Sequence, residues 1–585
     1  MGRLQRITRT SKERQIFRLL QDVVDHYGLR TNLRVAGGWV RNKMLGKTAG
    51  DIDIALDNIT GSAFVHHLQR FRVDVLGEKE RSVGLMRANP AQSKHLETAT
   101  TEVLGAAVDF AHLRSEDYAA HSRIPTNVQF GSPAADASRR DFTVNSLFYS
   151  LSDGGTVEDW TGRGVSDLED GVLCTPLRAA ETLSDDPLRA LRALRFAATF
   201  SFALAPALTD ALASPLLAEE LQRKVSRERV GIEVHKMLSL GGGRPLRALA
   251  LLREASLVDT VLPLAPRSGS AACEHGGQLA WSSEQWEVAF AQAQHVTAAR
   301  AAAPSTTIGA GHSVMVFAAL LSAALPAVQP PVLQASTDAG AAAQACALPE
   351  GNASSLQGSL EYAARLAETH AEALSSARHA AQHTLLGGLG LRKRDATSVS
   401  RIMAASQLLP PLPRRAIVKG GDARGVQLCR ATLEHCLRFE PCDRVRFGLW
   451  LHHAGDIWAS SLTVAAASAA ATAASASAAA TDDDGVATAA AAPRCGMQHE
   501  PMAWRGSVTT LKCALLRSGL LEAAVPWLTG HDVMERAGIP RGRDVGAALD
   551  CLRVWQLAHP CASVADASAF VEHGSLAGQG YADER

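Results

Sequence analysis

The chain lacks net charge, zinc-type cysteine spacing and membrane-length apolar runs, and each absence excludes a class of protein. Its 585 residues carry 59 Lys or Arg and 59 Asp or Glu, so it is not a global polycation of the kind that binds nucleic acid non-specifically. The ten cysteines form no CxxC pair, which argues against a zinc site and favours a reducing compartment. We find no secretory signal peptide, and the apolar run 314–325 is too short to span a bilayer, so we expect no membrane partner.

Positive charge is nevertheless concentrated at the start of the chain. Residues 1–50 hold eleven Lys or Arg and three acidic residues. Such a run is typical of a solvated surface, and it also suits a polyanionic partner. The Arg-rich residues 1–18 weakly resemble a mitochondrial transit peptide. The alternative, which we favour, is that residues 1–30 are a basic lead-in containing a helix around residues 16–27.

Strand and helix patterns divide the chain into an α/β head and a helical remainder. Strand-like runs and turns alternate in residues 31–176, with strands predicted at 35–40, 51–56, 72–76, 106–110 and 155–160. From residue 177 onward apolar residues recur at helical spacing, as in 188–200, 227–240 and 245–258. We therefore predict an α+β protein with a head (31–176), a helical neck (177–260), a helical body (261–463) and a helical tail (495–585).

Three stretches have the composition of insertions or tethers. Residues 267–310 and 327–360 are rich in Ala, Ser, Gly and Pro and hold little bulky apolar material, so we expect insertions there. Residues 464–494 are low-complexity Ala, Ser and Thr. A segment of such small side chains buries too little surface to offset its ordering entropy, and we predict a linker between body and tail.

The most informative segment, residues 33–56, reads as a strand, a Gly-Gly turn, a short helix and a second strand. Gly37 and Gly38 let backbone N–H groups approach an anion closely, because no Cβ intervenes. Asp51 and Asp53 alternate with isoleucines, so on a strand both carboxylates point to one face. A phosphate-binding turn beside paired carboxylates suits metal-dependent phosphoryl or nucleotidyl transfer, with Asp51 and Asp53 as Mg²⁺ ligands. The alternative is a turn with two solvated aspartates.

Two further residues could complete this site. Asp109 lies on another predicted strand and is a candidate third metal ligand, or else a structural or solvent-facing aspartate. Arg41 follows the Gly-Gly turn and could reach a triphosphate with its forked guanidinium, unless it is an ordinary surface arginine.

These motifs resemble those of tRNA nucleotidyltransferases, the CCA-adding enzymes, of the bacterial and eukaryotic class, which share a polymerase-like head with bacterial poly(A) polymerases. The fragments GGWVRN and DIDIAL match the first motif, and four more follow in order. They are SRRDFTVNSLFY (138–149), VEDWTGRGVSDLEDGVL (157–173), SDDPLRALRALRF (184–196) and KVSRERVGIEVHKML (224–238). Residues 528–560 resemble the closing region of the same enzymes.

The resemblance gives the second motif a role in binding the nucleotide. Arg139 and Arg140 supply positive charge for phosphate or RNA. Asp141 and Asn145 lie four residues apart and could share a helix face. The resemblance implies that Asp141 contacts the ribose 2′-hydroxyl, whereas a helix-capping role is the structural alternative.

In the fourth motif, Asp186 and Arg189 are expected to act together because they are spaced i, i+3. By resemblance this pair reads the incoming CTP or ATP by hydrogen bonding, in place of a template; a helix-surface ion pair is the alternative. Arg192 continues the spacing and could serve RNA phosphates or pair with carboxylates. The fifth motif, with Arg229, is expected to brace the neck against this helix.

Two segments need separate comment. Residues 113–130 have no clear period, and the resemblance implies a flexible loop there that helps the switch from adding C to adding A; an ordinary surface loop is the alternative. At residue 42 the usual family fragment VRD is replaced by Val-Arg-Asn. If the aspartate normally orients Arg41, Asn42 can substitute, because its side-chain oxygen still accepts a hydrogen bond.

The expected activity is Mg²⁺-dependent addition of C, C and A to the 3′ end of tRNA from CTP and ATP, releasing pyrophosphate. The alternatives are a poly(A) polymerase, a partial (CC- or A-) adding enzyme, and an inactive RNA-binding relative. Enzymes of this family serve cytosol, nucleus and organelles. We expect a cytoplasmic protein, with the mitochondrion and the nucleus left open, and the sequence does not give the oligomeric state.

Overall fold

The computed structural model divides the chain into two compact units, Met1–Val261 and Leu262–Arg585. It describes residues 6–79, 83–86, 98–118, 125–152, 154–239, 244–265, 280–302, 312–325, 353–408, 417–419, 426–428, 524–541, 543–559 and 562–573, with single residues between 450 and 520. The predicted boundaries of neck, body, linker and tail stay predictions. Beyond Val464 and Ala465, the predicted linker lies outside the described residues, as does most of the predicted insertion at 327–360.

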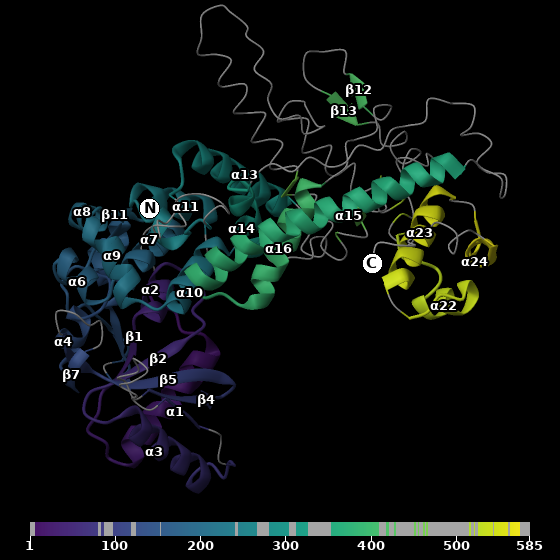
Figure 1. The fold of residues 1–585 in the computed structure, drawn as a ribbon. Coiled ribbons are helices and arrows are strands. Elements are labelled where there is room, and N and C mark those ends of the chain that lie inside the picture. The colour runs from purple at the N-terminus through teal and green to yellow at the C-terminus, as the bar shows by residue number, and fades with distance from the viewer. Residues whose placement is uncertain are drawn as a thin grey trace, which may run out of the picture. The chain divides into compact units, whose positions relative to one another are not determined.

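The first unit is built on a seven-stranded mixed sheet whose order is β3-β4-β5-β2-β1-β8-β9 (Figure 1). Strands β2 and β5 are parallel, and the other neighbouring pairs are antiparallel. The strands are β1 (Leu33–Ala36), β2 (Ile52–Leu56), β3 (Val83–Met86), β4 (Thr98–Val103), β5 (Ala106–His112), β8 (Phe148–Ser150) and β9 (Val157–Glu158).

Helices α1 (Ser11–His26) and α3 (Gly61–Asp74) pack against each other, and α3 also packs on β4 and β5. Helix α1 confirms the helix predicted around residues 16–27. It begins with a capping box in which the Thr10 hydroxyl accepts from the Glu13 N–H and the Glu13 carboxylate accepts from the Thr10 N–H. Its buried face carries Ile16, Leu20 and Val23.

Two strand predictions need correction. Of the strand predicted at 35–40 only Val35 and Ala36 belong to β1, and residues 38–40 begin the helix Gly38–Met44. The strand predicted at 72–76 is absent. Residues 72–76 form the end of α3 and the turn after it. The alternation of Val73 and Val75 suggested a strand, yet both valines are exposed, at 44% and 46%. The side chain of Arg72 is instead buried and donates to the carbonyl of Glu102, which anchors the end of the helix to the sheet.

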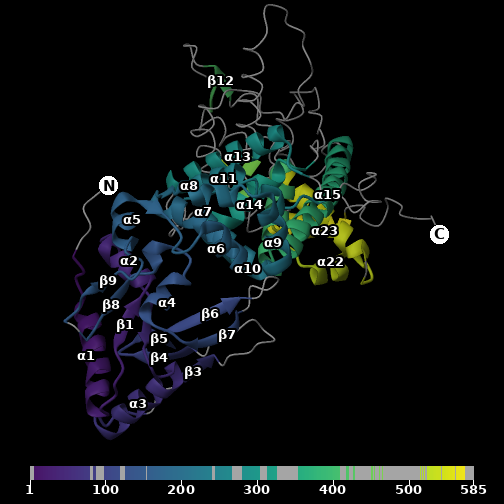
Figure 2. The same ribbon diagram turned by 90° about the vertical axis from the view of Figure 1, so that its left-hand side faces the viewer.

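The segment expected to be a loop, residues 113–130, contains an antiparallel pair, β6 (Arg114–Tyr118) and β7 (Pro125–Phe130). This pair is not part of the main sheet, and β6 packs against α4 (Pro133–Ser138) (Figure 2). Residues 119–124 lie outside the described residues.

The rest of the first unit is helical, as predicted. Helix α7 coincides with the predicted helix 188–200 and packs against α10 and α11, which confirm the predictions at 227–240 and 245–258. A short parallel pair, β10 (Val172–Leu173) and β11 (Ala203–Leu204), accompanies them. The helices are α5 (Gly164–Asp170), α6 (Ala179–Asp185), α7 (Leu188–Phe200), α8 (Pro206–Leu212), α9 (Pro215–Lys224), α10 (Arg227–Leu238), α11 (Pro245–Glu254) and α12 (Val258–Val261).

In the second unit, part of the predicted insertion 267–310 is an ordered helix, α13 (Ser283–Ala302). The composition argument failed because Trp286, Ala289, Ala293 and Val296 form a buried stripe at helical spacing. Helix α13 packs against α14 (His312–Ser322), which packs in turn with α15 (Ala353–Ala381) and α16 (Lys393–Gln407). A π-helix (Gln382–Gly388) follows α15, and β12 (Ile417–Lys419) pairs with β13 (Val426–Leu428).

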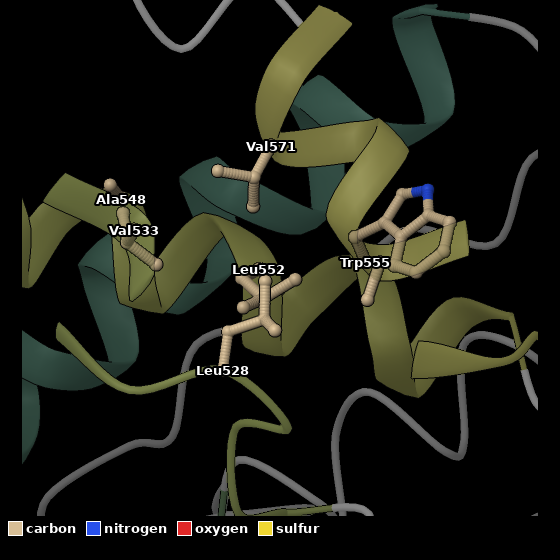
Figure 3. Close-up of a cluster of buried hydrophobic side chains, with 7 residues drawn as sticks. Leu528, Val533, Ala548, Leu552, Trp555 and Val571 are labelled. Carbon is tan, nitrogen blue, oxygen red and sulfur yellow. The ribbon is translucent and has the colours of Figure 1, made fainter. Parts of the chain in front are cut away.

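The end of the second unit has its own small core between α22 (Gly530–Ala537), α23 (Arg543–Ala558) and α24 (Val564–His573). Figure 3 shows Leu528, Val533, Leu552 and Trp555 among the side chains that fill it. Helix α22 begins with a capping box in which the Asp532 carboxylate accepts from the Thr529 N–H and hydroxyl.

The predicted fold class, an α+β head followed by a helical remainder, is confirmed. Among the described residues, no helix is long and apolar enough to cross a membrane.

The start of α3 makes a stability prediction for the head. A Cβ at Gly61 would lie 2.1 Å from the carbonyl oxygen of Phe110 on β5. We expect Gly61→Ala to lower the free energy of unfolding by about 2 kcal/mol, because backbone must shift to accept the methyl group. Differential scanning calorimetry would measure it, with Gly50→Ala as the control, since a Cβ there meets nothing within 4 Å. Equal melting temperatures for the two variants would contradict this packing.

Candidate active site

A cavity of about 650 Å³ in the first unit brings together every residue proposed for catalysis or nucleotide binding. Its walls come from the turn between β1 and α2 (Gly38–Met44), the start of β2, the segment after α4, and helices α7 and α10. The eleven predicted residues that line it are Gly37, Gly38, Arg41, Asp51, Asp53, Arg140, Asp141, Asn145, Asp186, Arg189 and Arg192.

The Gly-Gly turn is forced by its surroundings. Gly37 has φ +64°, and a Cβ there would lie 2.9 Å from Nη1 of Arg140 and 3.2 Å from the carbonyl oxygen of Asn145. Its N–H donates to the carbonyl of Leu147 at 2.9 Å, so this group is not available to an anion as the sequence suggested. Gly38, the first residue of α2, is the glycine left to approach a ligand.

The two aspartates follow the predicted alternation. Ile52 and Ile54 are 5% and 1% exposed, whereas Asp51 and Asp53 are exposed to the cavity. Asp109 on β5 stands directly opposite Asp53 in the parallel register and accepts a hydrogen bond from the Thr100 hydroxyl at 2.5 Å. Burial, together with the charges of Asp109 and Asp51, raises the pKa of Asp53, although Arg140 opposes the shift.

Arg41 is buried against the aromatic face of α7. Its guanidinium carbon lies 4.9 Å from the ring centre of Phe196 and 4.6 Å from that of Phe200. Asn42 Oδ1 accepts from Nε at 3.1 Å and from Nη2 at 2.9 Å, and Asn145 Oδ1 accepts from Nη1. Asn42 thus makes the orienting contact that the sequence required of residue 42.

Asp136 fixes the two arginines of the second motif. Its carboxylate accepts from Nε of Arg139 at 2.9 Å and from Nη2 of Arg140 at 2.8 Å, while Arg140 also donates to the carbonyl of Asn145. Although burial alone would raise the pKa of Asp136, Arg140 and Arg139 lower it to about 2. Asp136 could not be identified from the sequence, because it precedes the second motif. It does not line the cavity.

Asp141 and Asn145 are in direct contact, since the Asn145 amide donates to Asp141 Oδ1 at 3.0 Å. They do not share an α-helix face, because residues Thr143–Asn145 form a 3-10 turn. Asp141 accepts from Arg192 at 2.7 Å, and Arg192 also lies 3.7 Å from Glu233 on α10. Arg192 is therefore paired with carboxylates, one of the two roles open to it from the sequence.

Asp186 and Arg189 line the same cavity without bonding to each other's side chains. The Asp186 carboxylate accepts from Arg229 at 2.8 Å and from the N–H of Leu188. The Arg189 guanidinium donates to the carbonyls of Arg139 and Thr182. The contact between Arg229 and Asp186 is of the bracing kind expected of the fifth motif.

Five more residues line the cavity. Arg195 and Phe196 extend the face of α7 that carries Arg192, and their spacing of three and four residues from Arg192 is the signal that could have found them. Arg195 is held by Glu233 at 2.6 Å. The five are Arg139, Leu188, Arg195, Phe196 and Arg229.

Comparison with known proteins agrees with this head. Residues 33–174 match the family model described as the poly A polymerase head domain. The chain is 44% identical over 266 residues to the mitochondrial CCA tRNA nucleotidyltransferase of Saccharomyces cerevisiae, covering 44% of this chain and 48% of that protein. It is 43% identical over 265 residues to the enzyme of the same name from Candida glabrata, covering 44% and 49%.

A solved structure of a CCA-adding enzyme in an apo form shares the fold, with a TM-score of 0.54 at 16% identity, covering 96% of this chain and 95% of the other. The fold and the cavity thus define a poly(A)-polymerase-type head. Residues 33–174 therefore form a poly A polymerase head domain, and the relatives similar to this part of the chain include proteins named CCA tRNA nucleotidyltransferases. The matches span about half the length of the curated relatives.

Asp136 makes a prediction that depends on pH. A carboxyl whose pKa is depressed in the folded state stabilises that state above its unfolded pKa, and loses this contribution as the pH falls toward about 2. We expect Asp136→Asn to cost about 2 kcal/mol of unfolding free energy at pH 7. The difference in unfolding free energy between the wild type and Asp136→Asn should become smaller as the pH falls from 5 to 3.

Urea unfolding across this range measures the gap, and Asp22→Asn, at an exposed position on α1, is the control. A gap that stays constant with pH would contradict the ion pairs assigned to Asp136.

Proposed function

We propose that this protein adds C, C and A to the 3′ end of tRNA, using CTP and ATP without a nucleic-acid template and releasing pyrophosphate. The observation that carries the proposal is the meeting of two strand-end carboxylates and seven arginines in one cavity. Carboxylates suit metal-assisted attack, and arginines suit a polyphosphate. The yeast relatives named as CCA tRNA nucleotidyltransferases support the choice of substrate.

The donor set at the sheet edge fits magnesium. Asp51 and Asp53 present hard oxygen ligands, and the pKa of Asp53 is raised by burial and by the charges of Asp109 and Asp51, which a cation would offset. Among the described residues no three His, Cys, Asp or Glu side chains are grouped to hold a metal, so the proposal rests on Asp51 and Asp53, and Asp109 stays a possible third ligand. Magnesium commonly binds one or two carboxylates and completes its shell with substrate phosphates and water. When bound, it would activate the 3′-hydroxyl and neutralise the leaving pyrophosphate.

The chain's own residues bind and orient the nucleotide. Arg41 and Gly38 are assigned to the triphosphate, and Arg140 of the second motif, which lines the same cavity, is assigned to phosphate or RNA. Asp141, held by Asn145 and Arg192, is assigned to the ribose. Asp186 and Arg189 are assigned to the base edge, since a carboxylate and a guanidinium together offer acceptors and donors. The bond formed joins the 3′-oxygen to the α-phosphorus, and the bond broken releases pyrophosphate.

A mitochondrial location is part of the proposal, because the two yeast relatives are named mitochondrial and residues 1–18 are rich in arginine. Cytoplasmic and nuclear pools stay open. Tagged protein followed by fractionation would test it, and exclusion from mitochondria would contradict it.

A primer-extension experiment tests the activity. Purified protein, magnesium and a tRNA ending just before CCA receive CTP, ATP or both, and the 3′ ends are sized on a gel. We expect three added nucleotides with both substrates and two with CTP alone. Growth that stops at two would identify a CC-adder, and a long ladder with ATP alone would identify a poly(A) polymerase. No extension under any condition would leave an inactive RNA-binding relative.

Asp53→Asn separates chemistry from folding. Because the pKa of Asp53 is raised, its charge is unfavourable in the folded state at neutral pH, so the variant should melt at or above the wild-type temperature. Extension should fall roughly a thousandfold, since metal-assisted charge stabilisation is worth several kcal/mol. Wild-type extension rates in this variant would contradict the role given to Asp53.

A further inference from the structure

We propose that Asn42 is a positioning residue that fixes the Arg41 guanidinium without neutralising it, so that Arg41 keeps its full charge for the phosphates of a bound nucleotide. This inference rests on the proposed function. It concerns the strength and charge selectivity of nucleotide binding rather than the identity of the reaction.

The geometry at Asn42 is specific for an amide. Its Oδ1 accepts two hydrogen bonds from Arg41, and its Nδ2 donates to the carbonyl of Thr48 at 3.4 Å. Two arginine donors on one atom identify that atom as the oxygen. The third donor of Arg41 also meets an amide oxygen, that of Asn145. Three of its N–H groups are therefore bound by neutral acceptors.

Most other arginines of the cavity are paired with carboxylates. Asp136 holds Arg139 and Arg140, and Glu233 holds Arg195. Arg192 and Arg229 are paired with aspartates of the cavity itself. Across the part of the chain that the structure describes, Arg41 forms no ion pair, and Arg189 bonds to carbonyls.

Holding Arg41 in this way is costly for the free protein. The side chain is 7% exposed, and Phe196 and Phe200 pack against it. Burial lowers the pKa of Arg41 to about 10, although the attraction of Asp141 raises it. The positive charges of Arg195 and Arg192 lower it further. The group remains charged at neutral pH. The cavity is lined by seven arginines and four aspartates, so its side chains carry an excess of positive charge. An anion that enters the cavity would supply the missing negative charge beside Arg41.

An aspartate at position 42 would have nearly the same shape and the same acceptor geometry toward Arg41. It would add one negative charge beside the guanidinium and so compete with phosphate. The pair Asn42→Asp and Asn42→Ala therefore separates charge from orientation. Gln222→Glu, at an exposed position on α9, controls for a change of net charge outside the cavity.

The experiment measures binding of ATP, CTP and AMP to the full chain by calorimetry, without RNA, together with the melting temperature. For Asn42→Asp we expect an unchanged or higher melting temperature and an ATP affinity about tenfold weaker, from one added charge near the phosphates. The loss should be smaller for AMP, which carries less charge, and should shrink at high salt. Asn42→Ala should also weaken ATP binding, because it releases Arg41, but it adds no charge, so the loss should be smaller than for Asn42→Asp and less sensitive to salt.

The outcomes separate the two proposals. If wild-type protein binds ATP and CTP but Asn42→Asp binds ATP equally well or more tightly, the inference is overturned while the proposed function stands. The inference is likewise overturned if Asn42→Asp weakens the binding of AMP and of ATP by the same factor. It is also overturned if Gln222→Glu lowers ATP affinity as much as Asn42→Asp does. If wild-type protein binds neither ATP nor CTP, both proposals are overturned.

Discussion

Mutual repulsion among the arginines of one cavity is the constraint on which this active site depends. Seven guanidinium groups line one cavity, and each needs partners that hold it in place without filling the space meant for a ligand. The chain meets this need from behind the cavity wall. Asp136 and Glu233 lie outside the lining and are almost fully buried, and each holds two arginines. Arg41 differs because its acceptors are amides.

The surrounding fold follows from this requirement. The turn at Gly37, with φ +64°, brings the backbone close to Arg140 and to the carbonyl oxygen of Asn145, an approach that a Cβ would block. The parallel pairing of β2 with β5 sets Asp53 beside Asp109, which concentrates negative charge at the start of β2. Helix α7 then supplies both the aromatic surface under Arg41 and the arginines that face Asp141. A cavity with acidic and basic walls is suited to a metal–polyphosphate ligand.

Local patterns in the sequence predicted the lining of this cavity well. Glycine pairs and alternating aspartates have a short-range geometric meaning, so Asp51 and Asp53 could be grouped with the Gly-Gly turn from local pattern, whereas the assignment of Arg189 depended on the family resemblance. The carboxylates that hold the arginines of the cavity could not be predicted in the same way. Glu233 is 38 residues from Arg195, and nothing local distinguishes it from a surface glutamate. The α-helical face expected for Asp141 and Asn145 was wrong, because a 3-10 turn replaces it.

The errors in the fold have similar causes. Residues 72–76 alternate as in a strand, yet they form the end of α3 and the turn after it. The contact of the buried Arg72 with the carbonyl of Glu102 stabilises this helix end. The alanine-rich composition near residue 290 hid a stripe built around Trp286. In both places a few contacts between distant residues outweigh the local pattern.

Arg41, held by amides, is proposed to receive the nucleotide's phosphates in the cavity that also holds Asp51 and Asp53. A crystal structure of the protein with CTP and magnesium tests this assignment most directly. We expect triphosphate oxygens on Arg41, with the metal bound by Asp51, Asp53 and the phosphates. A triphosphate bound away from Arg41, or an Arg41 that turns to pair with a carboxylate when CTP is present, would contradict it.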